Sequence, residues 1–136
     1  MSKKSARIAE MIESLRGRAL DAHYLGYFEC FNQQLFYEAH DVLEELWLAQ
    51  RRAPNDLFYK GLIQLAGAFV HLQKDRLGPS AALFRLAQNN LVQYPPLHEE
   101  LRVTEVLALI DTWLKRLETG AENPLRTNAP PRLSVG

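Results

Sequence analysis

Apolar residues recur at helical spacing over most of the chain, and the strict alternation typical of strands is scarce. The pattern predicts helices over about residues 3–17, 20–32, 35–50, 55–75, 79–94 and 97–118. Only Gly17 separates the first two, so they can run together as one helix. The short connections favour antiparallel neighbours. We therefore expect an all-α fold, a compact bundle of about five helices.

Proline, asparagine and glycine mark the expected helix ends. Pro54 pushes Ala53 out of the α region, which ends the third helix. Asn55 is a good N-cap for the fourth helix, and Pro79 suits the first position of the fifth. Gly120 is expected to adopt the left-handed conformation past the end of the last helix.

The same pattern divides the chain into three parts. We expect an N-terminal helical extension over residues 1–18, a single helical-bundle domain over residues 19–119 and a flexible C-terminal tail over residues 120–136. The segment from Ala121 onward contains three prolines, no aromatic residues and few aliphatic ones. Such a composition predicts a frayed end.

The helix predicted over residues 35–50 is strongly amphipathic. His40 lies at the edge of its apolar arc beside Trp47, and Glu44 follows one turn later. A histidine and a glutamate four residues apart can hydrogen-bond along a helix or bind one metal ion together. Glu38 lies on the opposite, polar face and becomes a further carboxylate ligand only if helix packing turns it inward.

The helix predicted over residues 55–75 is apolar nearly all round, which is typical of a central helix. Gln64 and His71 belong to its one polar stripe, and Gly67 between them leaves either a shallow groove or room for another helix. Partly buried polar groups need partners. The nearest candidates on the preceding helix are His40 and Glu44.

Two segments together resemble domain-of-unknown-function family 309. Its first signature is similar to Phe31-Asn32 followed by residues 36–47, FYEAHDVLEELW, and its second is similar to residues 61–66, GLIQLA, followed by His71-Leu72. The resemblance covers roughly residues 20–117 and implies a small all-helical fold with no established activity. The family pattern has glycine where this chain has Gln34, which costs about 1 kcal/mol if that residue is left-handed.

A second departure concerns the residues after the second signature. The family tends to carry Arg-Gly-Asn where this chain reads Lys74-Asp75-Arg76, so this corner is expected to differ as well.

Two functional hypotheses use the same residues, His40, Glu44, Gln64 and His71. In the first, they form a hydrogen-bonded polar centre that ties two helices together in a structural or interaction module. In the second, His40, Glu44 and His71 bind a divalent metal ion such as zinc or iron, or a small ligand, and Gln64 orients a water or a substrate carbonyl. The second hypothesis includes a metal-dependent hydrolase.

Two further hypotheses concern the N-terminal half. Arg16 and Arg18 precede His23 at the spacing of arginine and histidine in one type of helical ribonuclease, although such pairs also arise by chance. Aromatic residues crowd residues 24–37, and aromatic side chains are common anchors of interfaces, so a homo-oligomer is a further hypothesis.

Composition narrows the classes of function. Sixteen basic and sixteen acidic residues give zero net charge, which argues against a dedicated nucleic-acid binder. Cys30 is the only cysteine, which excludes an intramolecular disulfide. The N-terminus lacks the apolar core of a secretory signal, and the longest apolar run, residues 62–72, is far shorter than the roughly 20 residues of a membrane span. We expect a cytoplasmic protein with no membrane partner.

The acidic and basic residues are unevenly distributed along the chain, although the net charge is zero. Residues 21–50 hold six acids and no lysine or arginine, whereas residues 51–88 hold six bases and two acids. The candidate site therefore begins on an acidic segment, where a cation is easier to hold than an anion.

Overall fold

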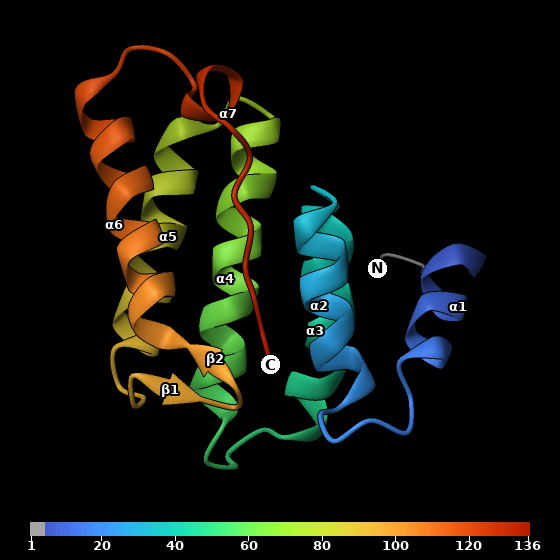
Figure 1. The fold of residues 1–136 in the computed structure, drawn as a ribbon. Helices are drawn as coiled ribbons and strands as arrows, with labels where there is room; N and C mark the ends of the chain where they lie inside the picture. The colour runs from blue at the N-terminus through green and yellow to red at the C-terminus, as the bar shows by residue number, and fades with distance from the viewer. Residues whose placement is uncertain (1–4) are drawn as a thin grey trace.

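The computed structural model describes residues 5–136, so the first residues of the predicted N-terminal helix lie outside the described part (Figure 1). Its helices are α1 (Ala6–Ser14), α2 (Ala22–Asn32), α3 (Phe36–Ala49), α4 (Asp56–Gln73), α5 (Leu77–Leu91), α6 (Val103–Thr119) and α7 (Pro124–Thr127). Two short strands, β1 (Leu97–His98) and β2 (Leu101–Arg102), pair as an antiparallel hairpin. The predicted all-α class is confirmed. None of the described helices has the length and apolar character that crossing a membrane requires.

Helix α4 is the centre of the bundle. It packs against α3 on one side and α5 on the other, while α2 packs on α3 and α6 on α5 (Figure 1). Eleven of its 18 residues are buried, which agrees with its nearly continuous apolar surface. The side chain of Phe69 makes ring contacts at 4.9–5.6 Å with residues of the four neighbouring helices, Phe31, Phe36, Phe84 and Trp113.

Helix α2 ends on a left-handed residue that is not glycine. Gln34 has φ 63°. Its N–H donates to the Phe31 carbonyl at 3.0 Å, and the N–H of Leu35 donates to the Cys30 carbonyl at 2.9 Å. This pair of bonds is the Schellman motif, which favours glycine at the left-handed position. Helix α4 ends in the same way, with Asp75 at φ 56°. Both departures from the family pattern therefore fall at left-handed helix ends.

Replacing Gln34 with glycine is expected to raise the free energy of unfolding by about 1 kcal/mol, because glycine adopts the left-handed conformation without steric cost. The Gln34 carbonyl, which accepts a hydrogen bond from Gln73 Nε2, is kept in the variant. Urea denaturation followed by circular dichroism measures the change. Gln34→Ala is the control, since it keeps the Cβ, and a gain as large in this variant would contradict the explanation.

The last long helix begins six residues later than the sequence pattern predicts. Residues 97–102 fold back as the β1–β2 hairpin, whose two turn residues, Glu99 and Glu100, have φ 48° and 57°. Turns of this kind favour asparagine and glycine, so two glutamates gave no turn signal. At the other end of α6, Gly120 is extended, with φ −108° and ψ 147°, and the expectation of a left-handed glycine was wrong.

The C-terminal segment, residues 120–136, also departs from the expected frayed tail. It forms the short helix α7 and then runs along the bundle in an extended conformation (Figure 1). Leu133 is buried, and its backbone N–H and carbonyl both bond to the side chain of Asn32 at 2.8 Å. Three prolines and few aliphatic residues predicted poor packing, but specific hydrogen bonds to the bundle hold this segment in place.

Candidate functional site

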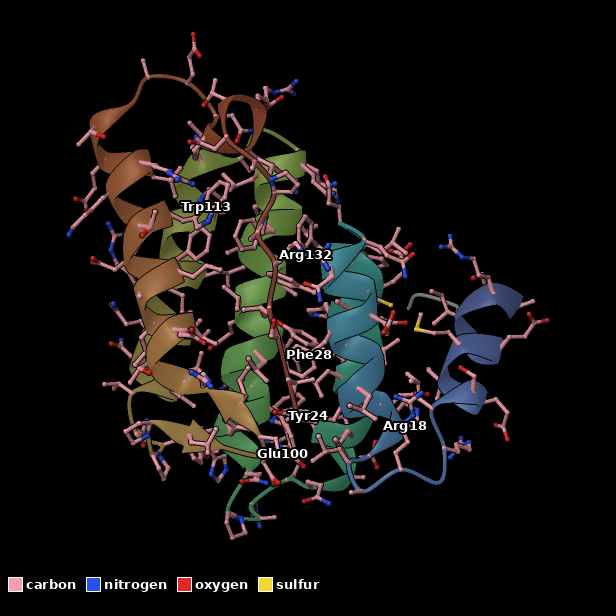
Figure 2. The ribbon with its side chains drawn as sticks, in the orientation of Figure 1. Arg18, Tyr24, Phe28, Glu100, Trp113 and Arg132 are labelled. Carbon is pink, nitrogen blue, oxygen red and sulfur yellow. The ribbon has the colours of Figure 1, made fainter. Side chains whose placement is uncertain are left out.

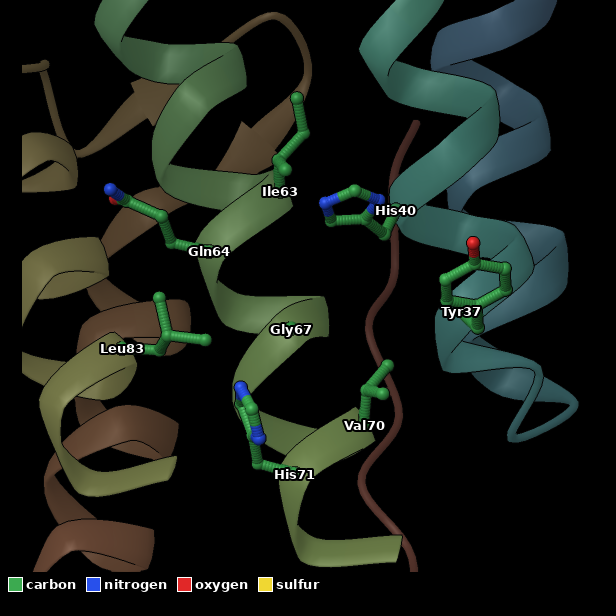
Figure 3. Close-up of a pocket in the computed structure, with 8 residues that line it drawn as sticks. All are labelled: Tyr37, His40, Ile63, Gln64, Gly67, Val70, His71 and Leu83. Atoms are coloured by element: carbon green, nitrogen blue, oxygen red, sulfur yellow. The ribbon is translucent and has the colours of Figure 1, made fainter. Parts of the chain in front are cut away.

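A cavity of about 220 Å³ lies across the outer face of α4, between α3 and α5 (Figure 3). Three of the candidate residues, His40, Gln64 and His71, line it. The remaining lining residues were not among the predicted site residues; they are Tyr37, Ile63, Gly67, Val70 and Leu83. None of the eight carries a carboxylate, an ammonium or a guanidinium group, so this described cavity is mostly apolar with a few uncharged polar groups.

Gly67 keeps the floor of the cavity open. A Cβ at this position would lie 3.1 Å from Cδ1 of Leu83, which is closer than ordinary van der Waals contact. The small residue therefore lets α5 approach α4 while leaving a hollow between Val70 and Ile63. The sequence signal for this groove was Gly67 itself, between Gln64 and His71 in the polar stripe.

The two histidines reach the cavity from different helices. Figure 3 shows the imidazole of His40 extending from α3 toward Ile63, and that of His71 lying along α4 toward Leu83. Among the described residues, the Nδ1 atoms of both rings are buried and have no hydrogen-bond partner. Buried polar atoms are nearly always paired, and the exceptions call for an explanation. Without a partner on Nδ1, neither ring is fixed in one tautomer, so Nε2 can donate or accept.

The environment of His71 favours its neutral form. Burial lowers the pKa of His71 below its usual value of 6.5, and the positive charges of Arg76 and Lys74 lower it further. His71 is therefore uncharged near pH 7. The ring of His40 stacks parallel to that of Tyr37, with centroids 6.3 Å apart, at the rim of the cavity.

The side chain of Gln64 forms a hydrogen bond with a residue of α5, and not with the candidate residues of α3. Its Oε1 accepts a hydrogen bond from Asn90 Nδ2 at 2.8 Å. This bond turns the NH₂ group of Gln64 away from Asn90 and leaves it as a donor. The hydrogen-bonded network predicted to join Gln64 and His71 to His40 and Glu44 is not formed by the bonds of residues 5–136. Asn90 was missed because it lies on a helix that the two motifs do not include.

The other candidate residues lie elsewhere. Glu44 is not among the residues that line the cavity. Trp47 Nε1 donates to Asp56 Oδ1 at 2.6 Å and so fixes the turn between α3 and α4. Glu38 does not line the cavity either. Burial raises the pKa of the Cys30 thiol on α2 to about 12, and the negative charge of Glu38 contributes to this shift.

The metal hypothesis gains no support. Residues 5–136 contain no group of three or more histidine, cysteine, aspartate or glutamate side chains placed to hold a metal ion. Of the proposed set, only the imidazoles of His40 and His71 line the cavity, and Glu44 does not. In the ribonuclease hypothesis, His23 Nε2 lies 2.8 Å from Glu45 Oε2 and Arg16 Nε lies 2.8 Å from Glu13 Oε2, while Arg18 lines a different cavity, beside α2.

Replacing His71 with leucine is expected to raise the free energy of unfolding at pH 7.5 by about 1 kcal/mol, because it removes a buried polar atom that has no partner. A lowered pKa in the folded protein means that protons favour the unfolded chain. His71 therefore costs stability as the pH falls below about 6.5. Urea denaturation at pH 7.5 and 5.5 measures the free energy of unfolding at each pH. The decrease from pH 7.5 to pH 5.5 should be larger in the parent than in His71→Leu. An equal loss in both would contradict the assignment.

Comparison with known proteins agrees with the two motifs. Residues 24–90, which run from the first turn of α2 into the last turn of α5 and include every residue that lines the cavity, match the family described as domain of unknown function (DUF309). The comparison with curated proteins gives no match, and the comparison with solved structures gives none. The chain therefore carries a DUF309 domain, as its FYEAHDVLEELW and GLIQLA segments indicated.

Proposed function

We propose that the protein is a binding module whose cavity between α3, α4 and α5 takes a small, uncharged, largely apolar molecule that carries a hydroxyl or carbonyl group. The observation that carries this proposal is the pair of imidazoles, His40 and His71, whose Nδ1 atoms have no partner in residues 5–136 although both rings line one cavity. Unpaired buried polar groups are costly for folding and are concentrated at functional sites.

Size and chemistry define the ligand. A cavity of about 150 Å³ accommodates benzene, so 220 Å³ suits a single aromatic ring with a small polar substituent. The NH₂ group of Gln64 can donate to an oxygen of this molecule, and the imidazole of His71 can accept a hydrogen bond from its hydroxyl group. The neutral state of His71 and the absence of charged lining residues disfavour a carboxylate or an ammonium group.

Phenol and benzoate form a matched pair of probes, because they share the ring and differ in charge at pH 7.5. We expect phenol to shift the ring resonances of His40 and His71 in NMR spectra, and benzoate to bind at least about tenfold more weakly, which corresponds to 1.4 kcal/mol. Equal binding of the two probes, or shifts confined to other residues, would contradict the proposal.

Gly67→Ala is expected to weaken phenol binding by about tenfold, because the added methyl group enters the floor of the cavity. The fold should tolerate this change, since the displaced atom is the end of the flexible Leu83 side chain. Gly78→Ala is the matched control: this glycine also lies in a helix, and a Cβ there would meet nothing within 4 Å. Titration by NMR should show weaker binding in the first variant only.

A further inference from the structure

The end of the C-terminal segment lies on the bundle in the manner of a bound peptide. From residue 131 onward its side chains alternate: Pro131 and Leu133 are buried and Val135 is half-buried, whereas the residues between them are exposed. Such alternation is typical of an extended chain with one face on a surface. In Figures 1 and 2 this stretch runs beside α2, past the labelled Arg132 and Phe28 toward Tyr24 and the hairpin.

The bundle also binds the backbone of this stretch. The amide of Asn32 on α2 donates to the Leu133 carbonyl and accepts from the Leu133 N–H, both at 2.8 Å. At the hairpin, Val135 forms an antiparallel bridge with Leu101, and the N–H of Gly136 donates to the Glu100 carbonyl at 3.0 Å. Backbone hydrogen bonds of this kind hold an extended peptide with little regard to its sequence, while pockets for alternate side chains select it.

The stretch fills its groove incompletely. A cavity of about 290 Å³ lies beside it on the side of α2 and is also lined by Arg18, Leu25 and Phe28. Another of about 210 Å³ lies on the side of α6 and is also lined by Val106 and Leu109. Both cavities are also lined by Leu133 and its neighbours. A peptide with larger side chains could therefore make contacts that the chain's own segment lacks.

A separate anchor fixes the start of the segment. Asp75, at the end of α4, accepts hydrogen bonds from Asn123 Nδ2 at 2.8 Å and from Arg126 Nε at 2.9 Å. These bonds hold the pKa of Asp75 at about 2, well below its usual value. The anchor keeps α7 in place, so the extended residues beyond it can leave the groove without loss of α7.

We propose that the groove between α2 and α6, closed at one end by the β1–β2 hairpin, is a docking site for an extended peptide of a partner protein with apolar side chains at alternate positions, and that residues 131–136 occupy it in the free protein. The chain's own segment shows the features that such a partner would share: alternate buried side chains, backbone hydrogen bonds to the bundle, and space beside it for larger side chains. The cavity on α4 is not involved, so this proposal stands independently of the proposed function.

The test uses the full chain with its own segment weakened. A fluorescently labelled peptide of residues 128–136 is titrated against Leu133→Asp, in which a buried leucine becomes a charge that should leave the groove. We expect binding to this variant to be at least tenfold tighter than to the parent. Ser134→Asp adds the same charge at an exposed position and should behave as the parent. A labelled peptide with aspartate at the position of Leu133 should not bind.

A second substitution tests the groove itself. In the Leu133→Asp background, Asn32→Ala removes the amide that holds the peptide backbone and should abolish binding. Leu133→Ala is a milder opening variant in case Leu133→Asp does not fold, which circular dichroism reports. If a folded opening variant does not bind the peptide, or if Ser134→Asp binds it equally well, the groove is not a docking site and the segment has only a structural role.

Discussion

Replacing Phe69 with alanine is expected to lower the free energy of unfolding by about 3–5 kcal/mol. The ring is fully buried and lies at the only place where aromatic side chains from α2, α3, α5 and α6 meet one residue of α4 in the described chain. The substitution removes the edge contacts of Phe69 and leaves a cavity that four surrounding rings are too rigid to fill.

Urea denaturation followed by circular dichroism measures this loss, provided that the parent unfolds in one cooperative step. Phe69→Leu keeps much of the volume and should cost clearly less. Leu86→Ala, on the outer face of α5 where the leucine is 47% exposed, should change stability by about 0.5 kcal/mol or less. If Phe69→Ala behaved like Leu86→Ala, α4 would not be the centre of the core.

Gly61→Ala is expected to lower the free energy of unfolding by about 1–3 kcal/mol, although alanine is the better helix former by about 1 kcal/mol. A Cβ at this position would lie 2.8 Å from Cγ and 3.0 Å from Cδ2 of Leu91, which is fully buried. Because the clash involves the branch point of a packed leucine, α4 and α5 must move apart.

Gly78→Ala is again the matched control, and it should be neutral or stabilising by up to about 1 kcal/mol, because nothing lies near the new methyl group. A double variant, Gly61→Ala with Leu91→Ala, should lose less than the sum of the two single changes, since the clash disappears. Additive losses would mean that Leu91 is not the obstacle. Urea denaturation followed by circular dichroism measures the two single variants, the double variant and the control, each against the parent.

The helices could be predicted from the sequence because each presents a continuous apolar surface at helical spacing. The central position of α4 followed from its apolar circumference, and 11 buried residues confirm it. Pro54 and Asn55 located the turn before α4, although the Asn55 side chain does not cap the helix and instead contacts His98 and Glu99. Periodicity identifies elements well, but it does not say which distant group a polar side chain meets.

The hairpin and the packed C-terminal segment could not be predicted from the periodicity of apolar residues. Both depend on contacts between residues far apart in the sequence, such as Leu101 with Val135 and Asn32 with Leu133. A two-residue strand has no periodicity to detect, and a Glu-Glu turn carries none of the usual turn residues. These features exist only because the folded helices provide a surface for them.

The candidate site was predicted in part. His40, Gln64 and His71 do line one cavity, because the polar stripe of α4 faces the edge of the apolar arc of α3. Glu44 is not among the lining residues, although it is four residues from His40 on the same helix. The partner of Gln64 could not be foreseen, since Asn90 reaches it from a third helix whose rotation no motif fixes.

The two tryptophans of the chain lie in opposite environments. Trp113 is 3% exposed and packs on Phe69, with the guanidinium of Arg116 4.8 Å from its ring centre. Trp47 is only partly buried, beside Arg51 and hydrogen-bonded to Asp56. Their fluorescence should therefore separate by emission wavelength, the core indole at shorter and the turn indole at longer wavelengths. One intrinsic signal thus reports loosening of the core and of the α3–α4 turn independently.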